Sequence, residues 1–88
     1  MKQIFENEQC RWYTTDETKI AGEYMKSKGL ADHFVSLAEL KADGRQEYIL
    51  LRADETGKTE AIFASSAMGE IVAQIDLLAT ILKKDDNE

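Results

Sequence analysis

The clearest pattern along the chain is an apolar residue at every third or fourth position near the C-terminus. The apolar positions of this stripe are Met68, Ile71, Ile75, Leu78 and Leu82. Such spacing places the side chains on one face of an α-helix. Ser66 is a residue type that caps helix N-termini, and Glu70 suits the positive end of the helix dipole. The pattern predicts a helix over residues 67–83.

Two further apolar residues of that helix, Leu77 and Ile81, fall on nearly the opposite side of the helical wheel. An amphipathic helix needs only one buried stripe, so this second pair is either exposed, which is common, or covered by something else. A cover could be the flanking strand or tail of the same chain, a protein partner, or a second copy of the chain that associates through the C-terminal helix. Leu77 and Ile81 are therefore candidate partner-binding residues.

The N-terminal segment is rich in β-branched and aromatic residues, which suit a pleated, half-buried surface. It predicts strands over 2–5 and 10–14, joined by a short turn. In the second strand Trp12 and Tyr13 are adjacent, so their side chains point to opposite faces. Both are candidates for partner binding, because Trp and Tyr are enriched at binding hot spots. For the single tryptophan, a place in the core is the favoured interpretation.

A helix is predicted over 16–28. Thr15 can accept a backbone N–H as its N-cap, and Gly29 is the residue type that most often ends a helix in the left-handed conformation. Between these ends, Ile20 and Tyr24 are four residues apart and form a narrow apolar stripe. This stripe is the candidate buried face of the helix.

The middle of the chain predicts three short strands. Segment 34–42 is compatible with a strand or a helix, because some of its apolar residues have helical spacing. A strand is favoured, because Asp43-Gly44 is a strong hairpin signal and a short apolar strand pattern, 47–53, follows it. A further turn precedes a third strand pattern at 59–64. Two such turns at regular spacing favour an antiparallel meander.

The predicted fold class is therefore α+β, in the order N-terminal strand or strands, helix, three-stranded meander, C-terminal amphipathic helix (β-α-β-β-β-α). We expect both helices to pack on one face of the sheet and enclose a single core. One domain would span residues 1–84, and residues 85–88 would form a frayed acidic tail.

Charge narrows the possible partners. The chain has 88 residues, 17 acidic and 11 basic, with a net charge of −6. Its basic residues are scattered, whereas nucleic acids and anionic membranes require clustered Lys and Arg. We therefore expect no direct nucleic-acid partner and no membrane. No apolar run matches a secretory signal or a membrane span, which predicts a cytoplasmic protein.

Candidate chemistry is sparse. His33 and Cys10 are the only residues of their types, and a catalytic dyad would need them to meet in space. A cysteine in a strand is more often a small apolar filler. No set of residues has metal-ligand spacing, and the glycines form no phosphate-binding loop. We predict no catalytic, cofactor-binding or metal-binding residues and no enzymatic activity.

These observations favour a small acidic module that binds a protein partner. An inhibitor or a regulatory adaptor of the phage, mobile-element or immunity type is the leading hypothesis. The first alternative is an acidic mimic that occupies a nucleic-acid-binding cleft. The second is a homodimer that forms a small-ligand site or an active site at its interface.

Overall fold

The computed structural model describes residues 1–86, with side chains as far as Lys83. Five strands and two helices are present in this part of the chain. Their bounds are β1 Lys2–Glu6, β2 Cys10–Thr14, α1 Asp16–Ser27, β3 His33–Leu40, β4 Gln46–Ala53, β5 Thr59–Ser65 and α2 Met68–Asp86. The predicted α+β class and the β-α-β-β-β-α order are confirmed, with two strands before the first helix.

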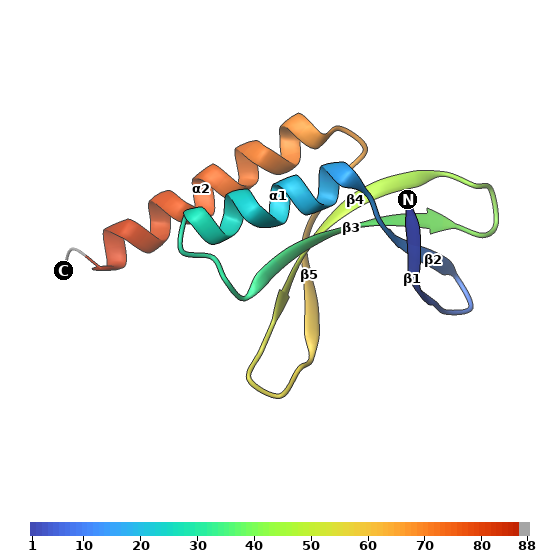
Figure 1. Cartoon of the computed structure of the whole chain (residues 1–88), viewed down its shortest axis with the longest axis horizontal. Coiled ribbons are helices and arrows are strands. Elements are labelled where there is room, and N and C mark those ends of the chain that lie inside the picture. The colour runs from blue at the N-terminus through green and yellow to red at the C-terminus, as the bar shows by residue number, and fades with distance from the viewer. Residues whose placement is uncertain (87–88) are drawn as a thin grey trace.

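All five strands form one antiparallel sheet in the order β1-β2-β3-β4-β5, and both helices cover the same face (Figure 1). The predicted meander is β3-β4-β5, and the β1–β2 hairpin joins its edge because β2 pairs with β3. The ambiguous segment 34–42 is a strand over most of its length. The turn that follows it explains this outcome: Gly44 has a φ of +73°, and Asp43 Oδ1 accepts the Arg45 N–H at 2.9 Å.

Both ends of α1 form as predicted. At the N-terminus, Thr15 and Thr18 make a reciprocal capping box in which each side-chain oxygen accepts the other residue's backbone N–H. At the C-terminus, Gly29 has a φ of +84° and the Leu30 N–H donates to the Met25 carbonyl at 2.9 Å. This is a Schellman ending, which returns the chain toward the sheet.

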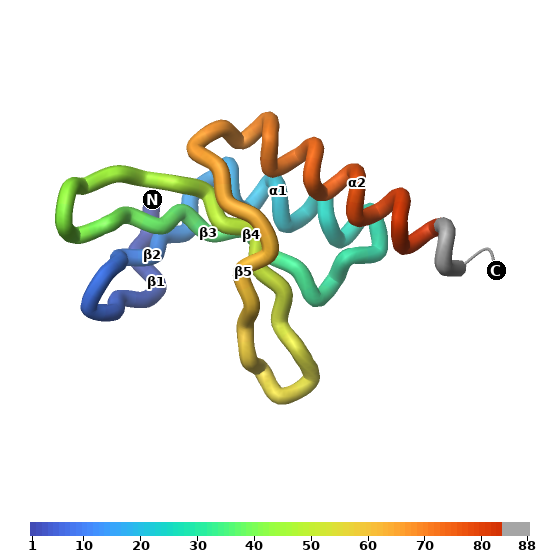
Figure 2. The backbone as a smooth tube through the Cα atoms, turned by 180° about the vertical axis from the view of Figure 1, so that it is seen from behind, coloured from blue at the N-terminus to red at the C-terminus, as the bar shows by residue number. Residues whose placement is uncertain are grey.

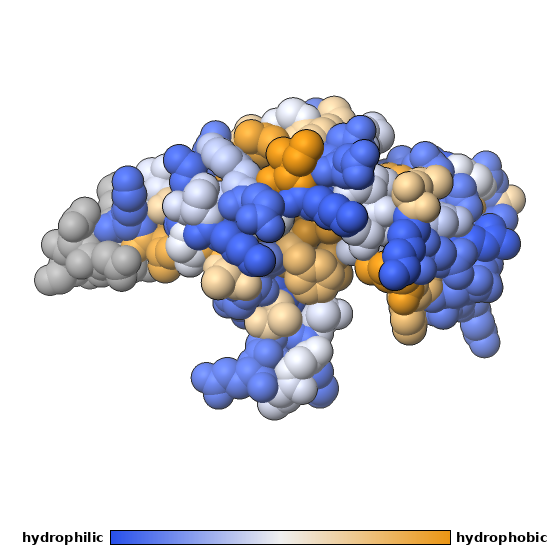
Figure 3. Space-filling model, in the orientation of Figure 1, coloured by the Kyte–Doolittle hydropathy of each residue, from blue (hydrophilic) through white to orange (hydrophobic). Residues whose placement is uncertain are grey.

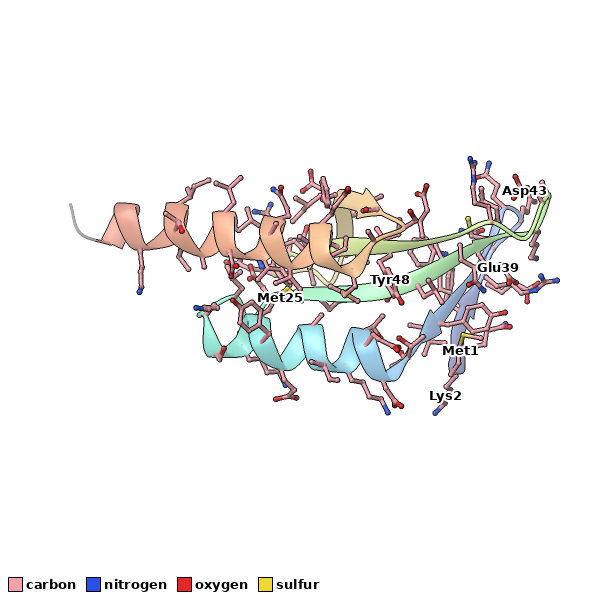
Figure 4. The ribbon with its side chains drawn as sticks, turned by 90° about the horizontal axis from the view of Figure 1, so that it is seen from above. Met1, Lys2, Met25, Glu39, Asp43 and Tyr48 are labelled. Atoms are coloured by element: carbon pink, nitrogen blue, oxygen red, sulfur yellow. The ribbon has the colours of Figure 1, made fainter. Side chains whose placement is uncertain are left out.

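The buried face of α1 differs from the predicted stripe. Ile20 is 69% exposed, whereas Ala21 and Met25 are buried in the core. The small side chain of Ala21 lets the helix approach β3 closely, and Met25 then fills the space between the helices and the sheet (Figure 4). If α1 were rotated about its axis to bury Ile20, the Met25 side chain would turn away from that space. Tyr24 packs at the edge of the core.

The core lies between the helices and one face of the sheet. Val35 on β3 is opposite Leu50 on β4, which in turn is opposite Phe63 on β5. Ile71 and Ile75 of α2 cover this row and are completely buried. The predicted stripe of the C-terminal helix is confirmed at these positions.

The predicted Ser66 cap is not present at the start of α2, and Ser65 instead holds the turn that leads into the helix. The Ser65 hydroxyl accepts the Ala67 N–H at 3.1 Å and donates to Glu70 Oε2 at 2.7 Å. Ser65 is the last residue of β5, so the end of the strand places its hydroxyl beside the start of α2. Ser66 makes neither of these two hydrogen bonds. The helix continues through residues 85 and 86 of the predicted tail, and residues 87–88 lie outside the described part of the chain.

The two outer hairpins project from the body of the molecule. In Figure 2 the β1–β2 hairpin and the β4–β5 hairpin extend separately from the region that the helices cover. The turn of the β4–β5 hairpin is held by Asp54, whose Oδ1 accepts the backbone N–H groups of Thr56 and Lys58 at 2.8 and 3.0 Å. The molecule measures 46 × 30 × 18 Å.

Candidate functional site

The face of the sheet opposite the helices is largely apolar. Cross-strand register places Trp12 opposite Ala38, and Phe34 opposite Leu51, on this helix-free face. An antiparallel sheet with one covered face normally has polar side chains on the other. Here Leu51 is only 8% exposed even though no helix covers it. The helix-free face is therefore already partly buried within the chain itself, which accounts for its apolar composition.

A groove with a volume of about 400 Å³ lies on this face. Its lining residues are Ile4, Phe5, Asn7, Trp12, Phe34, Ser36, Leu51 and Thr59. All five strands contribute to the lining, including the two edge strands. Opposite edges of the sheet can line one groove only because the sheet curls around it. None of these eight residues is charged, so the groove is a neutral, apolar surface.

The rim of the groove is formed by β1, in which Ile4 and Phe5 are 52% and 58% exposed. A β-bulge shifts the register between Gln3 and Phe5, so Ile4 has no partner on β2. Bulges re-aim side chains, and this one lets two consecutive apolar residues face the same groove. Figure 3 shows apolar surface beside β1 on the side toward the β4–β5 hairpin.

The second edge strand, β5, also has a bulge, because the register shifts at Ile62 between the pairs formed by Leu50 and Leu51. Bulges on edge strands twist the free backbone groups away from a regular ladder and hinder the addition of another strand. The two edges are therefore poor sites for strand pairing.

Trp12 contributes to the floor of the groove. The favoured sequence interpretation, a place in the core, is wrong, because Trp12 lies on the face opposite the helices. Its indole Nε1 is buried, and no acceptor for it is present among the described side chains and backbone. A buried donor without a partner costs about 1–3 kcal/mol. Trp12 thus lines the groove while its indole N–H is turned away from solvent.

Tyr13 lies on the other face, as the strand alternation predicts. It is opposite Leu37, and its hydroxyl donates to Glu39 Oε1 at 3.4 Å. The Arg11 guanidinium lies 3.4 Å from the same oxygen, and the Gln46 amide donates to the other at 3.1 Å. Glu39 lies on β3 beyond the helices (Figure 4). Tyr13 is therefore part of a polar cluster and not of the groove.

Leu77 and Ile81 form a separate surface. They are 53% and 50% exposed on α2, on the helix side of the sheet. The sheet separates them from Trp12, so the structure does not bring these candidate residues into one site. Their role in partner binding stays a prediction.

Cys10 and His33 do not meet. Cys10 is opposite Leu40 at one end of β3, and His33 begins the other end. Their positions are separated by roughly 23 Å along the strand. The His33 Nδ1 lies 2.7 Å from Asp32 Oδ1, and this hydrogen bond lowers the pKa of Asp32. Across the described side chains, no group of three or more His, Cys, Asp or Glu residues could hold a metal ion.

Part of the acidic surplus is paired with basic side chains. The Lys41 ammonium donates a hydrogen bond to Glu6 Oε2, and this hydrogen bond is the main reason why the pKa of Glu6 is lowered. The Glu60 carboxylate lies 3.5 Å from the Arg52 guanidinium. Such pairing is typical of a solvated surface and unlike the unpaired carboxylate rows that imitate a phosphate backbone.

Comparisons with known proteins add no further identification. No protein-family model matches the chain, and neither the curated proteins nor the solved structures contain a match. Within residues 1–86, no helix is long and apolar enough to cross a membrane. The groove must therefore be interpreted from its own chemistry.

Sequence reasoning found Trp12 but missed the other apolar residues of the groove. The available signal was pairs of consecutive apolar residues within strands: Ile4-Phe5, Phe34-Val35 and Leu50-Leu51. A strand with one solvated face alternates apolar and polar residues, whereas consecutive apolar residues indicate that both faces are covered.

Proposed function

We propose that this chain is a non-enzymatic protein-interaction module, an inhibitor or regulatory adaptor that acts in the cytoplasm. The observation that carries the proposal is the groove of eight uncharged residues on the helix-free face. In this proposal the protein partner packs against Phe5, Trp12 and Phe34. The phage, mobile-element or immunity setting remains the leading hypothesis for its origin.

The chemistry of the groove supports a protein partner. The cores of protein interfaces are depleted in charge and enriched in aromatic residues, and three of the lining residues are aromatic. Phosphate groups require cations, which this lining lacks. General acid–base catalysis requires a titratable side chain within reach of the substrate, and none of the eight lining residues is Asp, Glu, His, Lys, Cys or Tyr.

Leu77 and Ile81 on α2 are a second candidate contact, favoured by their exposure of 53% and 50%. Two half-exposed aliphatic side chains one helical turn apart bury far less surface than a stable interface requires. We therefore propose the groove as the main binding surface. The α2 pair would extend the contact if the partner is large.

Affinity capture with matched variants tests the proposal. The wild-type chain, Phe5→Ser and Ile20→Ser are immobilised separately and exposed to an extract of the host cell. Phe5 and Ile20 are both large, apolar and more than half exposed, but Ile20 lies on α1 on the other side of the sheet. We expect one stoichiometric protein on the wild type and Ile20→Ser, and its loss on Phe5→Ser. Equal recovery on all three would contradict the groove assignment.

Salt dependence separates this proposal from nucleic-acid mimicry. The affinity of a contact through an uncharged groove should change little between 50 and 500 mM salt. Over this range the Debye length falls from about 14 to about 4 Å. An acidic mimic binds through opposite charges, so its affinity falls steeply with salt and nucleic acid competes with it. A steep decrease, with displacement by DNA or RNA, would favour the mimic.

A further inference from the structure

We infer that the β1–β2 hairpin, residues 2–14, is a hinged flap that opens from the rest of the protein as one unit and closes to complete the groove. The inference rests on the proposed function, because the flap carries one wall of the same groove. The hinge lies where β2 meets α1, and a latch holds the opposite end of the flap beside β3. The remaining described residues, 15–86, form the scaffold from which the flap opens.

The flap lies outside the apolar core. Within residues 1–86, the core cluster contains no residue that precedes Ala21. The helices pack on β3, β4 and β5, and Figures 1 and 2 show the β1–β2 hairpin beyond the region that they cover. All residues of β1 are exposed, and those of β2 are half-buried. Because burial of apolar surface is the main source of stability, the core holds the scaffold together far more strongly than it holds the flap.

The backbone ladder between the flap and the scaffold is short. The register pairs β2 with β3 only from Cys10 to Tyr13, whereas β3 pairs with β4 along almost its whole length, from His33 to Glu39. Regions with few buried apolar contacts open locally at a lower free energy than global unfolding, often as whole supersecondary motifs. A hairpin attached through one short ladder is a motif of this kind.

The hinge has one fixed side. On the scaffold side, Thr15 and Thr18 form the buried capping box of α1, which sets the direction of the chain from Thr15 onward. On the flap side, β2 ends one residue earlier, at Thr14. Hinges are a few residues at the ends of elements that absorb the change in backbone angles. The step from Thr14 to Thr15 is therefore the point about which the flap turns.

The latch is Lys41, which follows β3. Its backbone N–H donates to the Gln9 carbonyl at 3.0 Å, and its ammonium donates to Glu6 Oε2. Gln9 precedes β2 and Glu6 ends β1, so one scaffold residue holds both strands of the flap at the end farthest from the hinge. The Lys41 and Glu6 side chains are 27% and 44% exposed, and ion pairs in contact with solvent contribute little. The latch thus closes the flap without locking it.

Between the hinge and the latch, polar side chains attach the flap. The Arg11 guanidinium and the Tyr13 hydroxyl both lie 3.4 Å from Glu39 Oε1, at the long end of the hydrogen-bond range. When the flap opens, water replaces these contacts, so their net contribution to closure is small.

Opening of the flap takes the groove apart. The flap supplies Ile4, Phe5 and Trp12 to the lining, and the scaffold supplies Phe34 and Leu51 among others. A partner seated in the groove would contact both parts and hold them together, because a ligand that binds only the closed form shifts the population toward it. As long as the closed form dominates, opening changes the affinity little.

Native-state hydrogen exchange of the full chain, followed by NMR, tests the inference. The amides of Arg11 and Tyr13 report on the flap, and those of Phe34 and Leu51 report on the scaffold. The Trp12 indole N–H is turned away from solvent and gives a side-chain signal from the flap. We expect the three flap signals to exchange with one shared opening constant, at least about tenfold larger than that of the scaffold.

Lys41→Met tests the latch, because it removes the ammonium and retains the backbone N–H. The opening constant of the flap should increase roughly two- to fivefold, the range for partly exposed ion pairs. Lys26→Met is the matched control, because Lys26 pairs with Glu23 at 3.9 Å within α1, and flap exchange should not change. If Lys41→Met does not fold, as judged by circular dichroism, Glu6→Gln and Glu23→Gln repeat the comparison.

Three results would overturn the inference. The first is exchange of flap and scaffold with the same opening constant, which would make the hairpin part of the global unfolding unit. The second is slow exchange of Arg11 and Tyr13 together with the scaffold while β1 exchanges fast, which would mean that β1 frays alone. The third is an equal change of flap exchange in Lys41→Met and Lys26→Met.

The protein that the wild-type chain captures separates this inference from the proposed function. If flap and scaffold exchange together and Phe5→Ser still loses that protein, only the flap is wrong. If the flap opens by itself and the captured protein leaves its exchange unchanged, the flap stands and the groove is not the binding surface.

Discussion

Phe5 lies directly opposite Trp12 in the β1–β2 pair, and both side chains line the groove on the helix-free face. Directly opposite aromatic residues on one face of a sheet stabilise each other by about 0.2–1 kcal/mol relative to alanine. Phe5 is nevertheless more than half exposed, and the Trp12 indole N–H is buried without a partner. The exposed part of this pair is therefore the Phe5 ring, and this is the part that a binding partner could cover.

The unpaired indole makes a prediction about Trp12 itself. Trp12→Phe removes apolar area but also removes the buried N–H that lacks an acceptor. The two effects oppose each other, so the free energy of unfolding should decrease by less than about 1 kcal/mol. Trp12→Ala leaves a cavity and should cost about 2 kcal/mol, below the range for fully buried aromatics. Urea denaturation measures both, and equal costs would contradict this account.

Gly22 weakens α1 without a structural benefit. A Cβ at this position would meet nothing within 4 Å. Gly22→Ala should therefore raise the free energy of unfolding by about 0.5–1 kcal/mol. Gly29→Ala is the matched control, because Gly29 has a φ of +84° and alanine there should lower stability by about 1 kcal/mol. Thermal denaturation shows whether each substitution raises or lowers stability. A destabilising Gly22→Ala would show that the helix packs more tightly there than described.

Asp54 should make stability depend on pH. Its pKa is lowered chiefly by the hydrogen bond from the Thr56 hydroxyl, with further bonds from the backbone of Thr56 and Lys58. A lowered folded-state pKa adds stability above the unfolded-state pKa and loses it as pH falls through the folded value. Asp54→Asn should thus be less stable than the wild type at pH 7. The difference should shrink below about pH 4, the ordinary range for Asp. A difference that is constant with pH would contradict the assignment.

The exposed pair on α2 gives a prediction about folding as well as binding. Leu77→Asp combined with Ile81→Asp should leave the fold intact, because both side chains are about half exposed, and circular dichroism checks this. Surface substitutions of this kind usually change stability by about 0.5 kcal/mol or less each. Partner capture should be retained. Loss of capture with an intact fold would move the main contact from the groove to α2.

Much of the fold could be predicted because its signals are local. Thr15 marks the start of α1 as its N-cap, and Gly29 marks its end in a left-handed conformation. Both features depend on neighbouring residues alone. The same holds for the turn at Asp43-Gly44, which decided that the segment before it is a strand. Periodicity identified Ile71 and Ile75 because α2 is long enough to repeat its pattern.

The groove could not be predicted in full because it depends on contacts distant in sequence. Ile4 and Thr59 lie on opposite edges of the sheet, and only its curl brings them to one hollow. The bulge that turns Ile4 inward is defined by pairing with β2, which the sequence of β1 alone does not show. The burial of Ala21 in place of Ile20 likewise follows from how closely α1 packs on β3.

The most direct test of the central claim is the ¹H–¹⁵N spectrum of the chain with and without the protein that it captures. The single Trp12 indole N–H gives one isolated signal in the groove floor, and backbone amides report on every element. The account predicts shifts of the indole signal and of the amides of Ile4, Phe5 and Phe34, with Ile20 unchanged. Shifts confined to α2 around Leu77 and Ile81, with the Trp12 indole signal unmoved, would contradict it.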